Sequence, residues 1–417
     1  METTLQIGRE IEGSWTVNLN AKDLESHIHG MGLSRSGKSM LMLSILIQLV
    51  RMKKPFCLID PHGSLYRDFI GWLVARNYRQ PITLFNPSYE NRIVGFNPFL
   101  TQYKDEARIM TKAERLSQQL LRVFGLDNSD QFGNIERWLR AFFYTILDWD
   151  LSISDLKYLL YWEYEKERRG FIEMVSSDIV RADLKELYSS KTEFEKKISS
   201  TKNKLQRFGH PQMRRIMGLK ENNINLPAVI EKKQSLLCNL QASEDDLVGK
   251  ENMKALGTLL ISEIWELFRK RTNPQEFYLI VDEAQEYMTP DLAAILPQSA
   301  KYGLHLMLFH QHPGQLTPGI ASAIKNAQTK LFFSTEDVPK EQRHFTLRRS
   351  DGKVTQCQSP LMSLQPASEK AIQKYIEKMT KDFLTVEQVD EKLNKSHNKG
   401  KPTKATYDDT QDGWAAR

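Results

Sequence analysis

The sequence of 417 residues is poor in cysteine and has no long apolar run, and each shortage excludes a class of protein. Its three cysteines, Cys57, Cys238 and Cys357, are odd in number and far apart, so we expect reduced thiols and neither a disulfide framework nor a metal cluster. The longest nearly apolar stretch, residues 40–50, falls short of the roughly 20 residues of a membrane helix. The first residues lack the basic and apolar segments of a secretory signal. We therefore expect a cytosolic protein without a transmembrane segment.

The composition is that of a globular chain. Hydrophobic residues make up 40% and charged residues 26%, which argues against both a disordered chain and a fibrous repeat. At roughly one to two hundred residues per domain, we expect two or three structural units. The net charge of +6 is concentrated, because nine Lys and Arg but only two Glu lie in residues 191–220, a local excess of +7 (9 − 2). The other residues sum to −1 (6 − 7), so the basic character belongs to one segment.

Hydrophobic periodicity predicts an α/β domain that is interrupted by helices. A strand at 26–30, an apolar helix at 38–52 and a strand at 56–60 form a βαβ unit, which indicates parallel strands. Helical patterns then fill residues 104–231. Further elements are expected as strands at 15–19, 82–85, 235–240, 277–281, 304–309 and 330–333 and a helix at 250–271. The predicted fold class is α/β, with a mainly parallel central sheet and an all-helical insertion.

Composition and pattern also predict the domain boundaries. The domain with the sheet is expected to comprise residues 1–103 and 232–350, and the helical insertion residues 104–231. Residues 351–417 are expected to hold C-terminal helices and a tail. From about Lys395 the sequence is rich in Lys, Asn, Gly, Pro and Thr, a composition typical of disordered segments.

Residues 32–39, Gly-Leu-Ser-Arg-Ser-Gly-Lys-Ser, match the phosphate-binding pattern G-x-x-x-x-G-K-[ST] and lie between the expected strand and helix. In such a loop backbone N–H groups face the β-phosphate, and the helix N-terminus adds partial positive charge. Lys38 can reach the β- and γ-phosphate oxygens, and Ser39 can coordinate Mg²⁺. The expected cofactors are therefore ATP and Mg²⁺. The predicted nucleotide-binding residues are Gly32, Ser34, Arg35, Ser36, Gly37, Lys38 and Ser39.

Two later strands lead to polar residues that suit the same site. Residues 277–281 are apolar and precede Asp282 and Glu283, the pattern of a buried strand that delivers carboxylates to the C-terminal edge of a parallel sheet. We expect Asp282 to hold Mg²⁺ with Ser39, and Glu283 to orient or deprotonate the attacking water. Gln311 follows the strand at 304–309, and it either senses the γ-phosphate or merely begins a loop. The predicted catalytic residues are Lys38, Asp282, Glu283 and Gln311.

The turn Asp60-Pro-His-Gly follows the second strand of the βαβ unit and should lie beside the nucleotide edge of the sheet. Asp60 and His62 either approach the phosphates or an adjoining subunit, or belong to a Pro-Gly turn that simply ends the strand. His310 and His312 have no Cys or carboxylate at ligand spacing nearby, which argues against a zinc site.

In the order and spacing of these motifs the chain resembles the HerA/FtsK class of P-loop ATPases, and within it the soluble motor part of TraD/TraG-type conjugative coupling proteins. Lys38 and Asp282 lie 244 residues apart (282 − 38), which fits the large helical insertion of coupling proteins. The segments that carry the resemblance are His29–Ser39, Leu58–Gly63, Gly95–Pro98, Leu236–Leu240, Asp282–Gln285, Gln311 and Asn326–Lys330.

The resemblance implies a RecA-like fold, a homohexameric ring with ATP at subunit interfaces, and ATP-driven translocation along DNA in the central pore. The implied roles are Walker A pair for Lys38 and Ser39, Walker B pair for Asp282 and Glu283, and sensor for Gln311. Relaxase and secretion-channel proteins are the implied partners. Two features depart from the family: His312 stands where many relatives have Arg, and the membrane helices with which coupling proteins usually begin are missing. Any membrane association is therefore expected to run through a partner.

The basic segment, residues 191–220, alternates cations with apolar residues. Its positive face either neutralises DNA phosphates or is a solvated helix surface. The predicted DNA-binding residues are Lys202, Lys204, Arg207, Arg214 and Arg215. Arg35, Arg207, Arg214 and Arg215 are all candidates for a cation that acts across a subunit interface.

A second function stays open beside the DNA translocase. HerA-like ATPases also serve as scaffold or regulatory subunits that control a partner nuclease or NADase in phage defence. A superfamily 2 helicase is excluded, because only 134 residues (417 − 283) follow Glu283 and they contain no arginine-rich motif of a second lobe.

Overall fold

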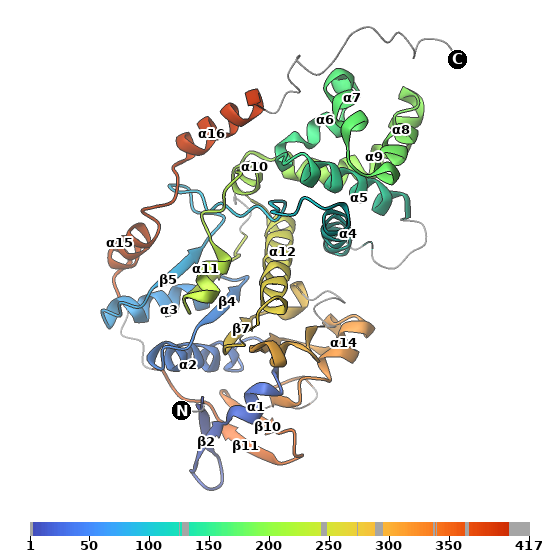
Figure 1. The fold of residues 1–417 in the computed structure, drawn as a ribbon. Coiled ribbons are helices and arrows are strands. Elements are labelled where there is room, and N and C mark those ends of the chain that lie inside the picture. Colours follow the sequence, from blue (N-terminus) through green and yellow to red (C-terminus); the bar gives the residue numbers. More distant parts are fainter. Residues whose placement is uncertain are drawn as a thin grey trace. The chain divides into compact units, whose positions relative to one another are not determined.

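A computed structural model describes residues 3–124, 126, 133–242, 248–272, 274–287, 295–336, 338, 340–362 and 367–399. The chain forms two compact units, whose helices and strands are labelled in Figure 1. The first unit contains Met1–Val94 and Asn223–Phe383, and the second contains Gly95–Asn222 and Leu384–Arg417. The 32–39 loop and all predicted catalytic residues belong to the first unit.

The first unit is built on an 11-stranded sheet in the order β2-β1-β11-β10-β9-β3-β8-β7-β4-β6-β5. The strands from β9 to β5 are parallel to their neighbours, whereas β2, β1, β11 and β10 extend the sheet with antiparallel pairs. The strands are β1 Leu5–Glu10, β2 Thr16–Leu19, β3 Ile28–Met31, β4 Phe56–Asp60, β5 Ile82–Phe85, β6 Ser235–Asn239, β7 Phe277–Val281, β8 Leu304–His310, β9 Thr329–Phe332, β10 His344–Arg348 and β11 Val354–Gln358. The predicted fold class, α/β with a mainly parallel central sheet, is confirmed.

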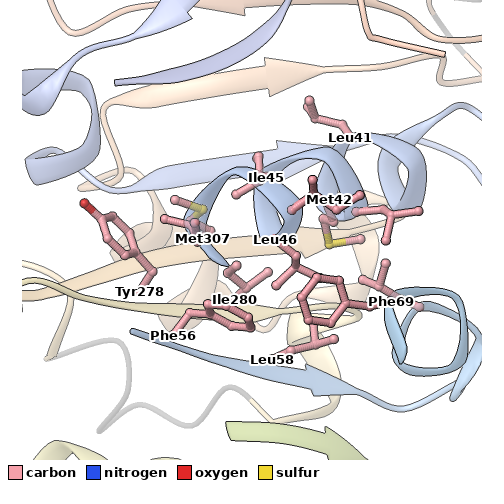
Figure 2. Close-up of a cluster of buried hydrophobic side chains, with 14 of the residues drawn as sticks. Leu41, Met42, Ile45, Leu46, Phe56, Leu58, Phe69, Tyr278, Ile280 and Met307 are labelled. Carbon is pink, nitrogen blue, oxygen red and sulfur yellow. The ribbon is translucent and has the colours of Figure 1, made fainter. Parts of the chain in front are cut away.

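The core of the first unit lies between helices and this sheet. Its helices are α1 Ala21–Glu25, α2 Lys38–Arg51, α3 Ser64–Ala75, α11 Leu226–Glu231, α12 Lys250–Arg269, α14 Pro318–Ile324 and α15 Glu369–Met379. Helix α2 is apolar along most of its length and buries side chains on nearly every turn, because it packs on the sheet. Strands β4, β7 and β8 are buried throughout, as expected where both faces of a parallel sheet are covered. Figure 2 shows side chains of α2, α3, β4, β7 and β8 in one cluster: Leu41, Met42, Ile45, Leu46, Phe56, Leu58, Phe69, Tyr278, Ile280 and Met307.

The second unit consists of helices in its described residues. They are α4 Glu106–Val123, α5 Gly133–Asp148, α6 Lys157–Leu160, α7 Glu165–Met174, α8 Asp178–Leu187, α9 Lys191–Leu205, α10 Pro211–Met217 and α16 Val386–Lys399, with short 3₁₀ turns at Ile153–Leu156, Trp162–Tyr164 and Gln206–Gly209. Helix α5 packs against α4, α8 and α9 (Figure 1). It is central because Trp138, Phe142 and Ile146 repeat at helical spacing and are fully buried.

Three details of the predicted boundaries are wrong. The sheet does not end at residue 350, because β11 pairs with both β10 and β1. The helical unit begins at Gly95 and ends at Asn222, and α11 belongs to the first unit. The C-terminal helices divide between the units: α15 packs on α3, whereas α16 contacts α10 through the buried Val389 and Leu393. The predicted tail from Lys395 begins inside α16, and from residue 400 it lies outside the described residues.

The sequence analysis also predicts a chain without a transmembrane segment. Within the described residues, no helix is both long and apolar enough to span a bilayer.

Candidate functional site

The 32–39 loop joins the end of β3 to the start of α2, where the phosphate-binding pattern requires it. Gly37 has a φ of +110° and lies against the main chain of Arg343, where a Cβ atom at position 37 would come within 2.9 Å of the Arg343 Cα. Both the backbone angle and the close contact therefore require glycine.

Neighbouring strands hold this loop from both sides. The Gly32 N–H donates to the His310 carbonyl at the end of β8 (3.2 Å), and the Leu33 N–H donates to the Ser334 carbonyl after β9 (2.8 Å). The Arg343 N–H donates to the Ser36 carbonyl at 3.0 Å. The loop is thus fixed by main-chain hydrogen bonds, with its own side chains left to bind a ligand.

Lys38 places its ammonium group inside the loop. It is buried, and its Nζ donates to the carbonyl of Gly32 and, at 3.0 Å, to that of Leu33. Burial lowers the pKa of Lys38, while the negative charges of Asp282 and Glu283 oppose that shift. The structure therefore brings the cation close to both predicted carboxylates.

Asp282 and Glu283 follow β7 and are both buried. The Asp282 N–H continues the ladder to the Ile59 carbonyl (3.0 Å), and the Asp282 Oδ1 accepts the Glu283 N–H (3.0 Å). Burial, with the nearby charges of Asp60 and Glu283, raises the pKa of Asp282 to about 7. A carboxyl group in this state gains its charge readily when a cation binds.

Glu283 differs from its neighbour in both backbone and side chain. Its φ of +46° lies in the left-handed region, which is uncommon for a non-glycine residue and is found most often at functional sites. Its Oε1 accepts from Gln311 Nε2 (2.5 Å) and lies 3.6 Å from His62 Nε2, and its Oε2 accepts from Gln285 Nε2 (2.7 Å). Burial alone would raise the pKa of Glu283, but the bonds from His62, Gln311 and Gln285 and the Lys38 charge lower it to about 2.

Gln311 follows β8, which is the parallel neighbour of β7, and its amide reaches across to Glu283. The two groups at the Asp60 turn take different positions. Asp60 is fully buried, and its carboxylate accepts the N–H groups of His62 (2.9 Å) and Tyr66 (2.8 Å) at the start of α3. His62 instead faces Glu283, whose hydrogen bond raises the pKa of the imidazole.

A pair of buried histidines was missed by the sequence analysis as a structural feature. The rings of His29 in β3 and His310 in β8 stack at 4.9 Å, and their Nε2 atoms are 2.7 Å apart. Burial lowers the pKa of both groups, that of His29 to about 3. His310 Nδ1 faces the His312 carbonyl (3.2 Å), which can only accept, so His310 Nε2 accepts a hydrogen bond from the Nε2–H group of His29. The pair joins the strand before the loop to the strand before Gln311.

A cleft of about 260 Å³ opens beside Glu283. Glu283, Gln311 and His62 line the cleft, as do Lys250 and Lys254 of α12. Its remaining lining residues are Pro61, Leu240, Ala242, Met253, Gln285, Glu286, Tyr287 and Gln315. The cleft gives solvent and small groups access to the ionised carboxylate.

The residues of the loop fit a magnesium nucleotide. The hydroxyl of Ser36 is buried and has no hydrogen-bond partner among the described residues, so a polar group is left to be satisfied there. Ser34, Arg35 and Ser39 are exposed at the mouth of the loop. Lys38 supplies a cation, and the oxygen ligands that Mg²⁺ prefers are available from Ser39 and Asp282.

The predicted DNA-binding cations lie in the second unit and largely have partners. Lys202 Nζ is 4.1 Å from the centre of the Tyr161 ring. Lys204 and Arg207 both lie over the Phe124 ring, at 5.3 and 5.5 Å from its centre.

The fifth candidate, Arg215, makes two hydrogen bonds to Asp390 of α16, at 2.9 and 2.8 Å. Arg214 beside it on α10 is partly exposed. Elsewhere in the basic segment, Lys197 and Lys220 contact acidic side chains. The local excess of charge is therefore partly neutralised within the second unit.

Neither a protein-family model nor a curated protein sequence matches the chain. Solved structures do match it. VirB4 of Thermoanaerobacter pseudethanolicus has a TM-score of 0.55 at 12% identity, over 88% of this chain and 98% of that chain. The bacterial conjugative coupling protein TrwBdeltaN70 has a TM-score of 0.53 at 14% identity, over 86% of this chain and 82% of that chain. The plasmid coupling protein TrwB in complex with ADP and Mg²⁺ has a TM-score of 0.50 at 14% identity, over 82% of this chain and 79% of that chain.

These similarities bear on the fold. The chain has the RecA-like P-loop fold of the VirB4 and coupling-protein structures, and the resemblance to coupling proteins that its motifs indicate is thereby confirmed at the level of the fold.

Proposed function

We propose that this protein is a magnesium-dependent ATPase that moves DNA, in conjugative transfer or a related mobile-element process. The observation that carries the proposal is the ionised, strained Glu283, held by Gln311, Gln285 and His62 beside the 32–39 loop. This is the arrangement that an attacking water needs at the end of a bound triphosphate.

Each residue of the site then has a role. Lys38 binds the β- and γ-phosphate oxygens, and Ser39 and Asp282 hold the Mg²⁺, which neutralises developing charge when it is bound. Glu283 orients the water and accepts its proton. A general base with a low pKa is a weak proton acceptor, so its main contribution is positioning, and its hydrogen bonds must rearrange when the proton is taken.

Gln311 couples hydrolysis to the rest of the sheet edge. Its amide binds Glu283, and its main chain continues from β8, whose His310 carbonyl accepts the Gly32 N–H of the loop. A change of nucleotide at the loop therefore acts on the C-terminal end of β8, which Gln311 directly follows. This supports the sensor role, because Gln311 contacts the general base Glu283 and directly follows His310, whose carbonyl holds the loop.

The proposal extends to assembly and partners. We propose a homohexameric ring with DNA in its pore and ATP between subunits, and relaxase and secretion-channel proteins as partners. The support comes from the coupling-protein and VirB4 structures, which share this fold and in one case hold ADP and Mg²⁺. Lys202, Lys204, Arg207 and Arg214 are the proposed DNA contacts of the second unit, and Arg215 is proposed to join them when it is released from Asp390.

The test is hydrolysis of ATP with and without DNA. We expect DNA to stimulate turnover, this stimulation to fall steeply with salt, and Lys38→Ala to abolish hydrolysis in both conditions. Lys250→Ala, which removes an exposed lysine whose ammonium group lies 3.8 Å from Glu286, is the matched control and should retain turnover. An ATPase rate that is indifferent to DNA would overturn the motor and favour a regulatory ATPase that controls a nuclease or NADase.

A further inference from the structure

Arg343 covers one side of the 32–39 loop, although it belongs to none of the recognised motifs. Its N–H donates to the Ser36 carbonyl at 3.0 Å, and its Cα and Cγ lie 2.9 and 3.3 Å from where a Cβ of Gly37 would stand. Arg343 and the loop belong to the same unit. The main chain and the first part of the side chain of Arg343 are therefore packed directly against Gly37, the glycine that precedes Lys38.

The backbone in and around the loop includes residues with a positive φ, a strained conformation that is found most often at functional sites. Among the described residues, nine that are not glycine have a positive φ, and three of them belong to the loop or to residues around it: Arg35 (+63°), Glu283 (+46°) and Arg343 (+69°). Such conformations are unfavourable and persist where the surroundings enforce them. For Arg343 the surroundings are its bonds to Ser36 and Ser359.

The side chain of Arg343 is held by one hydrogen bond and has further N–H donors available. One N–H of Nη1 donates to the Ser359 carbonyl (3.0 Å), and the Ser359 N–H returns a hydrogen bond to the Arg343 carbonyl (2.9 Å). The other guanidinium N–H groups have no partner within the described part of the chain, and the side chain is only partly buried. A guanidinium has five donors and no acceptor, and its planar fork suits phosphate oxygens.

We propose that Arg343 is a nucleotide-binding residue, whose guanidinium contacts the phosphate chain of a nucleotide held in the 32–39 loop of the same subunit. This inference rests on the proposed nucleotide site. A contact to phosphate oxygens that ATP and ADP share strengthens the binding of both nucleotides. Because the contact does not touch the base, its effect is equal for adenine and guanine nucleotides.

The test is Arg343→Asn, since asparagine tolerates a left-handed φ and keeps the N–H bond to Ser36 while the charge is removed. Loss of a charge-assisted hydrogen bond predicts a rise of about tenfold to a hundredfold in the Kd of Mg-ADP and the KM of ATP. We expect kcat to change little, because the contact is equal before and after hydrolysis. Arg343→Lys should recover part of the affinity, since it restores the charge without the fork.

Arg348→Asn is the matched control, because Arg348 is exposed on β10 of the same hairpin and the substitution removes the same charge. It should leave Kd and KM unchanged. A purely structural role for Arg343 would lower the temperature of unfolding in Arg343→Asn with a normal Kd for Mg-ADP, and that result overturns the inference. If the unsubstituted protein binds no Mg-ADP at all, the proposed function fails as well, so the two failures are distinguishable.

Discussion

The charged groups of the first unit and those of the second unit are organised in opposite ways. Around the 32–39 loop, Lys38, Asp282 and Glu283 are buried, and each has a shifted pKa. In the basic segment of the second unit, Lys202 and Arg215 are partly exposed, and they contact the ring of Tyr161 and the carboxylate of Asp390, respectively. Burial makes an electrostatic interaction strong and specific, whereas solvent and salt weaken it at a surface. Substitutions in the two units should therefore differ in size and in salt dependence.

The largest effect is expected from Glu283→Gln. The amide keeps the shape of the side chain but cannot orient water with a charge or take its proton, so kcat should fall by about 10²- to 10⁴-fold. Binding of ATP should persist, because Glu283 belongs to neither the loop nor the metal ligands. Single-turnover hydrolysis and equilibrium binding of ATP measure the two quantities separately.

Glu286→Gln is the matched control for this substitution. Glu286 lines the same cleft and lies 3.8 Å from Lys250, yet it makes no contact with Gln311 or His62 in the described structure. It should retain kcat. Normal turnover in Glu283→Gln would show that Glu283 does not orient or deprotonate the attacking water. Charged groups of the first unit would then not be more important for function than those of the second unit.

The parts of this site that could be predicted from sequence are those in which an apolar, buried strand leads directly to a polar residue of the site. The apolar run of β7 ends in Asp282 and that of β8 in Gln311, so pattern alone located both groups at one edge of the sheet. The partnership of His62 with Glu283 could not be predicted in the same way. It depends on the pairing of β4 with β7, two strands separated by more than 200 residues of sequence.

Other elements were missed because their patterns are short or ambiguous. Strand β10 alternates the buried Phe345 and Leu347 with less buried residues, a strand pattern that the sequence analysis overlooked. Strand β11 buries Thr355 and Cys357 and exposes Val354, so its apolar pattern is weak. Their omission placed the domain boundary too early and left Arg343, which immediately precedes β10, outside every predicted site. The division of α15 and α16 between the units depends on tertiary contacts, which local pattern does not encode.

A smaller effect is expected from Asp282→Asn on stability without nucleotide or Mg²⁺. Asp282 has a pKa of about 7 in the folded protein against an ordinary value of 3.8, so the folded state binds the proton more tightly. Its contribution is therefore most favourable at low pH and is lost as pH rises through 7. Because asparagine does not ionise, the variant should be more stable than the unsubstituted protein by about 1–3 kcal/mol at pH 8, and by little at pH 4.

Thermal unfolding at pH 4 and pH 8 measures this difference, and Asp60→Asn is the control of opposite sign. Asp60 is equally buried, but both of its oxygens accept main-chain N–H groups, and an amide offers only one acceptor. That variant should be destabilised at both values of pH. An Asp282→Asn variant that is less stable at pH 8 would show that the charge of Asp282 is compensated in the folded protein.

The smallest effect is expected at the surface of the second unit, from Asp390→Ala. This substitution removes the partner of Arg215, while Val389 and Leu393 still bury α16 against α10. The freed guanidinium should tighten DNA binding by about 1.4- to fivefold at low salt, which corresponds to the 0.2–1 kcal/mol typical of exposed ion pairs. The slope of affinity against salt should steepen by about one, because one more phosphate is neutralised. Arg215→Ala should change neither quantity, since that charge is already paired. If Arg215→Ala binds DNA more weakly than the unsubstituted protein, Arg215 exchanges Asp390 for a DNA phosphate even while Asp390 is present. The exposed ion pair would then not fix the partner of Arg215, in contrast to the buried hydrogen bonds that hold Glu283.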